Sequence, residues 1–139
     1  MRKKFHNSKK NNMNILVLDD EIGILKIIKT NVEKNGYNCI ITDDHIEAIK
    51  IIRNNNPKID IFITDYLMID ITAEEIIEEV RSFNKDIYII LQTGYFQNIP
   101  GLYAMKNFDI DSFVEKDTDF EDLLIKIEIG AKCLKRIYK

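Results

Sequence analysis

The sequence predicts an α/β fold: a doubly wound, five-stranded parallel sheet with helices on both of its faces. Short apolar segments alternate with longer segments in which apolar residues recur every three or four positions. Nearly continuous apolar strands are typical of a parallel sheet that is covered on both sides. Glycine and proline are scarce, with five and two among 139 residues, and no internal repeat is visible. These features together predict one compact domain.

The first half of the chain predicts three strands that are each followed by a helix. The strands are expected at residues 15–19, 38–42 and 59–64. The first helix is expected to end at Asn35-Gly36, the second to be capped by Asp44 and the third by Thr72. The residues expected to face the core from these helices are Ile22, Leu25, Ile28, Val32, Ile46, Ile49, Ile52, Ile76, Ile77, Val80 and Phe83.

The second half predicts two more strands, two helices and a possible interface. The strands are expected at 87–91 and 112–114, and a weak helix between Pro100 and Phe108. The core-facing residues of a long final helix are expected to be Phe120, Leu124, Ile127, Ala131, Leu134 and Tyr138. Ile125 and Ile129 form a second apolar stripe on that helix. This stripe indicates either a homodimer through the last helix or a chain that continues beyond Lys139.

Charge is unevenly distributed along the chain. The net charge is −3, but residues 1–13 carry five Lys or Arg and no acid, which leaves −8 for residues 14–139. We therefore expect a flexible basic tail over 1–13, for which solvation is a better explanation than nucleic-acid or lipid binding, and one domain over 14–139. The sequence shows no secretory signal or membrane span, so we expect a cytoplasmic protein. Cys39 and Cys133 are expected to be buried thiols without chemistry.

Acidic residues follow two of the predicted strands. Asp19, Asp20 and Glu21 follow the first strand, and Asp65 ends the third. Because parallel strands deliver their carboxyl ends to one edge of the sheet, these carboxylates are expected to lie together. Clustered carboxylates raise each other's pKa unless a cation is near, so the cluster implies a cation. Mg²⁺, or Mn²⁺, is the natural candidate, because it is held by one or two carboxylates, such as Asp20 and Asp65, together with phosphate oxygens.

Two hydrogen-bond donors are expected at the same edge. Thr93 follows the fourth strand and Lys116 the fifth, and their hydroxyl and ammonium groups suit a phosphoryl group. Each of them alone is explained as well by a strand-end hydroxyl or a surface charge. Their joint spacing with the carboxylates favours a phosphoryl site over coincidence.

This order of residues resembles the receiver domain of bacterial two-component response regulators, over residues 14 to about 138. By this resemblance Asp65 is the phosphoacceptor, and the metal is held by Asp19, Asp20, Asp65 and the backbone carbonyl of Leu67. Met68 stands where the family has its Asp-x-x-Met methionine. The resemblance also implies a flavodoxin-like strand order, 2-1-3-4-5.

The resemblance implies that Thr93 is the switch hydroxyl, Phe113 the switch aromatic and Lys116 the phosphoryl-binding lysine. The site would then catalyse only its own phosphorylation and dephosphorylation, with no turnover of an external substrate. A sensor histidine kinase or phosphotransfer protein would donate the phosphoryl group. A downstream protein effector, or a covalently linked output domain, would receive the signal, because the chain shows no DNA-binding or membrane segment of its own.

Three residues depart from the family's pattern: Ile69 and Asp117 replace common prolines, and Ala73 replaces a common glycine. The family's lysine-proline bond is typically cis, whereas we expect a trans bond before Asp117, because a cis bond to a residue other than proline costs about 2.5–4 kcal/mol. Leu67 and Tyr95 offer no carboxylate or amide to orient water near Asp65, which predicts slow self-dephosphorylation.

Two other functions compete with a working receiver. A dehalogenase-like phosphatase also uses a strand-end aspartate with magnesium, but it needs a second aspartate two residues later. Glu21 and Leu67 occupy those positions, so the phosphatase motif is absent. The stronger alternative is a degenerate receiver that acts as a phosphorylation-independent docking module.

Overall fold

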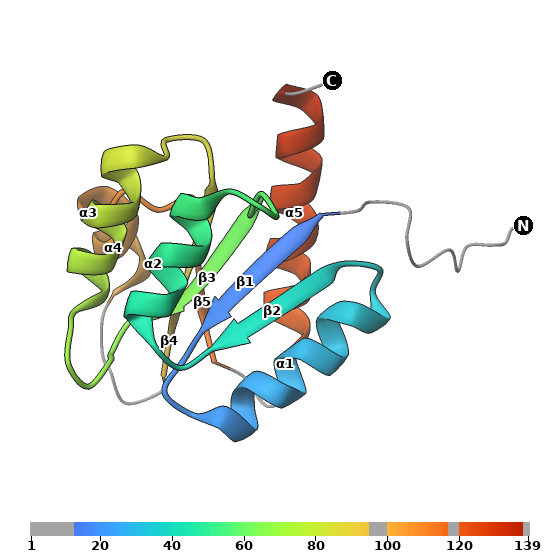
Figure 1. Ribbon diagram of the computed structural model, residues 1–139, viewed down its shortest axis with the longest axis horizontal. Helices are drawn as coiled ribbons and strands as arrows, with labels where there is room; N and C mark the ends of the chain where they lie inside the picture. Colours follow the sequence, from blue (N-terminus) through green and yellow to red (C-terminus); the bar gives the residue numbers. More distant parts are fainter. Residues whose placement is uncertain (1–12, 95–99, 117–119, 138–139) are drawn as a thin grey trace, which may run out of the picture.

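The computed structural model describes residues 13–94, 100–116 and 120–137 and shows a parallel sheet between two layers of helices (Figure 1). The five strands lie in the order β2-β1-β3-β4-β5, and all four neighbouring pairs are parallel. The strands are β1 Asn14–Leu18, β2 Asn38–Thr42, β3 Ile61–Asp65, β4 Tyr88–Thr93 and β5 Ser112–Glu115. The helices are α1 Ile22–Lys34, α2 His45–Asn54, α3 Ala73–Phe83, α4 Gly101–Asn107 and α5 Glu121–Ile137. The predicted fold class and strand order are confirmed.

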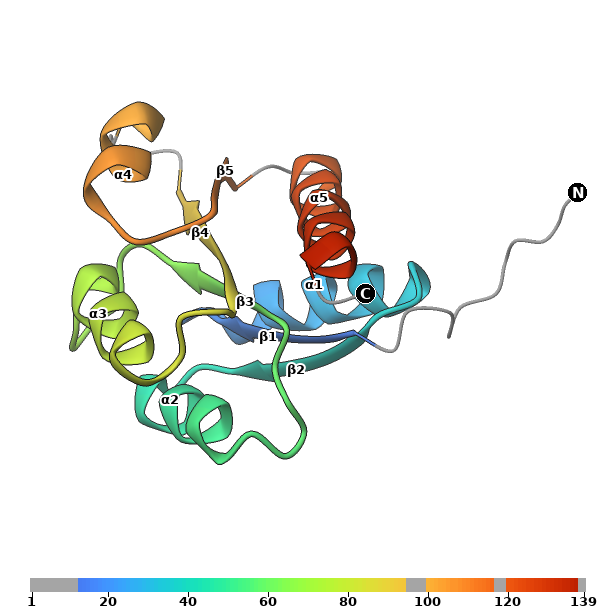
Figure 2. The same cartoon turned by 90° about the horizontal axis from the view of Figure 1, so that it is seen from above.

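Helices α2, α3 and α4 cover one face of the sheet, and α1 and α5 cover the other (Figure 2). Successive residues of a strand point alternately to the two faces of the sheet. In β1, Leu16 and Leu18 pack under α2 and α3, whereas Ile15 and Val17 pack under α1 and α5. All four side chains are fully buried. Burial on both faces explains why the strands are apolar at successive positions rather than at alternate ones.

The two predicted helix caps are present. Asp44 accepts a hydrogen bond from the backbone N–H of Ile46 at 2.9 Å, at the start of α2. Thr72 accepts from the backbone N–H of Glu75 at 3.1 Å, and the Glu75 carboxylate accepts from the Thr72 N–H in return. These bonds satisfy N–H groups that have no partner within the first helical turn.

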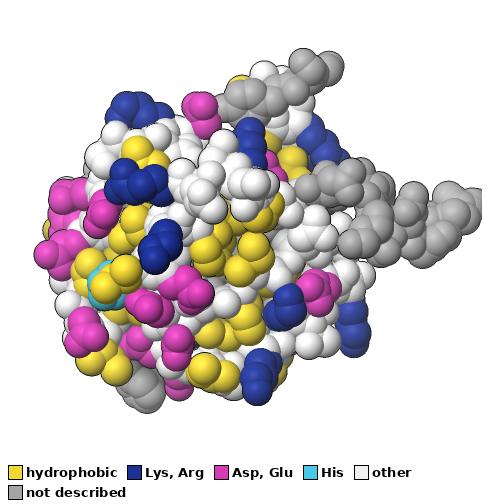
Figure 3. Space-filling view, viewed as in Figure 1, with side chains coloured by type: hydrophobic (Ala, Val, Ile, Leu, Met, Phe, Trp, Pro, Cys, Tyr) yellow, Lys and Arg dark blue, Asp and Glu magenta, His cyan; other side chains and the backbone are white. Residues whose placement is uncertain are grey.

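The prediction that Ile22 and Ile46 face the core is wrong. Ile22 is 49% exposed and Ile46 is 62% exposed. Both lie in the first turn of their helices, where the preceding strand has just ended and there is no sheet beneath to cover them. Hydrophobic side chains therefore remain on the surface near the start of α2 (Figure 3). Strand boundaries differ by one or two residues; for example, β1 ends at Leu18 rather than at Asp19.

Helix α5 has both predicted stripes. Ile127, Ala131 and Leu134 are buried, and Leu123 joins them although the spacing did not predict it. Ile125 and Ile129 are 46% and 45% exposed, as expected of the second stripe. Tyr138, predicted to continue the first stripe, lies outside the described residues.

Arg81 is a buried charge near the end of α3 that the periodicity did not reveal. Its guanidinium donates to Oδ2 of Asp111 at 2.8 Å, and that oxygen also accepts from the backbone N–H of Ile89 at 2.9 Å. The Arg81 guanidinium also donates to the backbone carbonyl oxygens of Lys85, Ile87 and Asp109. Arg81 thereby ties α3 to the start of β4 and to the segment that enters β5.

The cysteines behave as expected in part. Cys39 is buried in β2, and burial raises the pKa of its thiol to about 12, which makes it unreactive at neutral pH. Cys133, in α5, is only partly buried. None of the helices in the described part of the chain is both long and apolar enough to span a membrane.

Two glycines provide a matched test of the packing. A Cβ at Gly130 of α5 would lie 2.8 Å from ring carbons of Tyr88, whereas a Cβ at Gly23 of α1 would meet nothing within 4 Å. We expect Gly130→Ala to lower the free energy of unfolding by about 1 kcal/mol or more, because overpacking outweighs the gain in helix propensity. Gly23→Ala should raise it by about 0.5–1 kcal/mol. Urea unfolding measures both, and a stabilised Gly130→Ala protein would contradict the close approach of α5 to β4.

Candidate functional site

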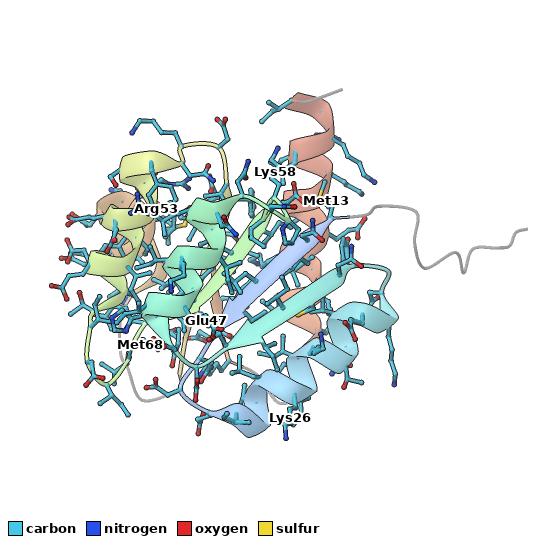
Figure 4. All side chains as sticks on the ribbon, viewed as in Figure 1. Met13, Lys26, Glu47, Arg53, Lys58 and Met68 are labelled. Atoms are coloured by element: carbon cyan, nitrogen blue, oxygen red, sulfur yellow. The ribbon has the colours of Figure 1, made fainter. Side chains whose placement is uncertain are left out.

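The polar residues predicted for the site meet at the carboxyl edge of the sheet. Asp19 follows β1 directly, Asp65 ends β3 and Thr93 ends β4. Lys116 follows β5, and its backbone N–H donates to the carbonyl oxygen of Thr93 at 2.7 Å. Met68, in the loop after β3, marks this edge in Figure 4, where Met13 and Lys58 mark the opposite one. Parallel pairing alone is enough to bring these four loop positions to one edge.

Lys116 contacts three carboxylates, two from the loop after β1 and one from the end of β3. Its Nζ lies 2.7 Å from Oδ2 of Asp19 and 3.3 Å from Oδ2 of Asp65. A longer contact of 3.8 Å reaches Oε1 of Glu21. Asp19 and Asp65 are buried, with 0% and 4% of their surface exposed. Because charges that are buried without partners cost several kcal/mol, the ammonium group offsets part of the cost of burying these two carboxylates.

The electrostatics of the cluster follow from this arrangement. Burial alone would lower the pKa of Lys116, but its hydrogen bond to Asp19 and the charges of Asp65 and Asp19 raise the pKa above its ordinary value. The pKa of Asp20 is also raised, first by burial and then by the charge of Asp19, although Lys116 and a hydrogen bond from the backbone of Ile69 act against this. The negative charge of Asp19 thus raises the pKa of Asp20, as expected for clustered carboxylates. Lys116 supplies part of the positive charge that such a cluster requires.

The donor set fits a magnesium ion that keeps much of its water. Among the described residues, no three Asp, Glu, His or Cys side chains are arranged to enclose a metal ion. Mg²⁺ seldom needs such a cage, because it is usually held by one or two carboxylates and several waters. Asp20 is partly exposed and has no close ion pair among the described residues, so a cation beside it would lower its raised pKa. Leu67 lies in the loop after Asp65, which a backbone bridge between Leu67 and Thr72 closes.

Thr93 and Phe113 lie on adjacent strands beside this cluster. Thr93 is 2% exposed and Phe113 is half-buried. The ring of Phe113 packs against the first residue of α4, because Gly101 has no side chain: a Cβ there would lie 3.0 Å from Cδ2 of the ring. The sequence reasoning missed Gly101, for which the only signal is a glycine directly after Pro100 at the start of a helix.

Several predicted residues cannot be placed. Tyr95 and Asp117 lie outside the described residues, and so do the bond between Lys116 and Asp117 and the tail up to residue 12. The predictions for these positions therefore stay predictions.

Comparisons with known proteins agree with this geometry. The family model of the response regulator receiver domain matches residues 15–128. This chain therefore belongs to the response regulator receiver domain family. A receiver domain protein from Clostridium thermocellum is 28% identical, with a TM-score of 0.80, and the match covers 90% of this chain and 98% of that one. No match was found among curated proteins.

Two further solved structures are similar to this chain. The response regulator TrrA from Thermotoga maritima, solved in complex with Mg²⁺-BeF, is 30% identical, with a TM-score of 0.72 and coverage of 85% of this chain and 98% of that one. A complex of the histidine kinase ThkA with TrrA matches at 29% identity and a TM-score of 0.72, and covers 85% and 97%. Receiver domains are signalling domains. Because this chain belongs to the family, it is a signalling domain too.

Removing the charge of Asp19 and removing that of Asp20 are expected to change the stability of the folded protein in opposite directions. Asp20→Asn should stabilise the metal-free protein at neutral pH, because a raised pKa in the folded state means that ionisation of Asp20 opposes folding. This penalty is present above the folded-state pKa and absent below the ordinary value of 3.8, so the gain should vanish on acidification. Asp19→Asn should destabilise by about 1–3 kcal/mol, because it removes the closest partner of Lys116.

Urea unfolding in EDTA at about pH 7 and about pH 3 measures both changes. An Asp20→Asn protein that is less stable than the wild type at neutral pH would contradict the electrostatics described above.

Proposed function

We propose that this chain is a phosphoacceptor receiver domain that takes a phosphoryl group onto Asp65 from a phosphohistidine. The observation that carries the proposal is a buried carboxylate, Asp65, held 3.3 Å from a lysine ammonium at the carboxyl edge of the sheet. A buried carboxylate that stays ionised is a nucleophile, and the adjacent ammonium stabilises the charge that develops on transferred phosphoryl oxygens.

The transfer is an in-line displacement at phosphorus. An Oδ atom of Asp65 forms the new O–P bond, the N–P bond of the donor histidine breaks, and its electron pair returns to the imidazole ring. The ammonium group of Lys116 and the hydroxyl group of Thr93 donate to phosphoryl oxygens. Asp19, Asp20, Asp65 and the carbonyl oxygen of Leu67 would hold Mg²⁺, which supplies charge neutralisation between the two anionic reactants.

The acyl phosphate then changes the charge around Lys116 and Thr93. Attraction of the Thr93 hydroxyl towards the phosphoryl group opens space beside β5, into which Phe113 can turn. Because Phe113 packs on Gly101, this rotation is transmitted to α4. A local change of charge thereby biases a surface formed by α4, β5 and α5.

The proposed partners follow from this role. The donor is a sensor histidine kinase or a phosphotransfer protein, and the signal passes to a protein effector or a covalently linked output domain. The receiver domain comprises residues 14–139 and lies in the cytoplasm, with residues 1–13 as a basic tail. The exposed stripe of Ile125 and Ile129 on α5 supports a homodimer as one form of output. Turnover of an external substrate and direct DNA binding form no part of this proposal.

Intact-mass spectrometry after incubation with acetyl phosphate tests the proposal. We expect a Mg²⁺-dependent adduct of one phosphoryl group on the wild type and none on Asp65→Asn, because the acceptor oxygen is lost. Asp86→Asn removes an exposed acid at the opposite edge of the sheet and should leave the adduct unchanged. No adduct under any condition, with the fold intact by circular dichroism, would overturn the proposal in favour of a phosphorylation-independent docking module.

The adduct should be long-lived. The side chain of Leu67 is 61% exposed beside the acceptor and has no polar atom that could orient an attacking water. We expect a half-life of minutes or longer once acetyl phosphate is removed, and a decrease of about tenfold or more in Leu67→Asn, whose amide can hold water. Ile69→Asn is the matched control, because it adds the same amide two residues farther away. A wild-type half-life of seconds without a phosphatase would contradict the prediction.

A further inference from the structure

Two grooves lie side by side on the loop that follows the phosphoacceptor. One, of about 350 Å³, runs between this loop, the start of α3 and Phe108. The other, of about 320 Å³, runs between the same loop and the start of α2. Both are lined by Met68, Ile69 and Asp70, so residues 68–70 form a ridge between them. The two grooves and the ridge are called the ridge surface below.

The ridge surface exposes large apolar side chains. Ile69, at its centre, is 84% exposed, and Leu67 and Ile46 on either side are 61% and 62% exposed. A single exposed isoleucine needs no explanation, but three large apolar side chains around one ridge are typical of an interaction site. Around the histidine at the lower left of Figure 3, hydrophobic and acidic side chains are intermixed.

The charge of the ridge surface has one sign. Its lining includes six carboxylates and no lysine or arginine. The six are Asp20, Asp43, Asp44, Asp70, Glu74 and Glu75. These six carboxylates are not gathered around one point, because no three acidic, His or Cys side chains of the described residues are grouped to enclose a metal ion, and only Asp20 among them belongs to the proposed magnesium site. Carboxylates that are spread around an apolar ridge instead complement an extended ligand with several positive charges.

We propose that the ridge surface docks a cationic amphipathic helix of a partner protein. Two or three apolar side chains of that helix cover Ile46, Leu67 and Ile69, and its lysine and arginine side chains face the surrounding carboxylates. The surface also touches the phosphorylation site, because the backbone of Ile69 is hydrogen-bonded to the carboxylate of Asp20. Docking does not require phosphorylation of Asp65, so the two proposals can fail separately.

A peptide titration followed by amide NMR locates the site. The probe is a synthetic helical peptide with leucine on one face and lysine on the other, and the same peptide with glutamate in place of lysine is the charge control. In the absence of acetyl phosphate, we expect the lysine peptide to shift amides of residues 43–47 and 66–75, and higher salt to weaken it. Shifts elsewhere, no binding, or equal binding of the glutamate peptide would overturn the proposal.

Matched variants test the two parts of the surface. Ile69→Ser should weaken binding on the order of tenfold through lost apolar burial, and Asp70→Asn by a few-fold. Ile137→Ser removes an isoleucine of α5 that is 67% exposed and should change nothing. If Ile137→Ser abolishes binding instead, α5 is the docking face and the proposal is wrong. Self-association in sedimentation equilibrium that Ile69→Ser abolishes would assign the surface to a second copy and would likewise overturn it.

Discussion

The arrangement of the site depends on one ammonium group placed among buried carboxylates. Asp19 and Asp65 have almost no access to water, and each would pay a large desolvation cost as an isolated anion. Lys116 offsets that cost for both at once, at 2.7 Å and 3.3 Å. Because the three residues follow β1, β3 and β5, this contact also fixes three loops relative to one another. The end of β4 is connected differently, through the hydrogen bond from the backbone N–H of Lys116 to the carbonyl oxygen of Thr93.

The same contact divides the acidic cluster into an inner and an outer part. The inner carboxylates, Asp19 and Asp65, contact Lys116 directly, and its positive charge offsets part of the cost of their burial. Asp20 is farther out, and its raised pKa shows that Lys116 does not fully compensate it. A divalent cation would therefore gain most of its electrostatic stabilisation at Asp20, because Lys116 already offsets part of the charge of Asp19 and Asp65. Asp19 and Asp65 are buried, whereas Asp20 is partly exposed. This difference favours two cations with separate positions, the Lys116 ammonium group inside and a metal ion outside, over one cation shared by all three carboxylates.

The sequence was sufficient for the fold class and for placing Asp19, Asp65, Thr93 and Lys116 at one edge of the sheet, because the strands and their ends are set by local signals. Strand order needs the family resemblance, but the meeting of Asp19, Asp65 and Lys116 follows from parallel strands alone. Ile22 and Ile46 were misplaced because helical spacing says which side faces inward but not where the sheet beneath the helix ends. Arg81 and Gly101 were missed for a different reason. Asp109 and Asp111 are 28 and 30 residues from Arg81, and Phe113 is 12 residues from Gly101, so no short pattern connects them.

The outer part of the cluster connects the proposed phosphorylation site to the surface around Ile69. Asp20 lines one of the two grooves and also belongs to the site. A positive side chain that docks in the groove favours the ionised form of Asp20, and by linkage an ionised Asp20 favours docking to the same extent. A metal ion beside Asp20 competes for that charge, so metal binding and cationic docking oppose one another wherever they share this carboxylate. The acidic residues farther out, Asp43 and Glu74 among them, are not shared in this way, and docking through them is independent of the metal.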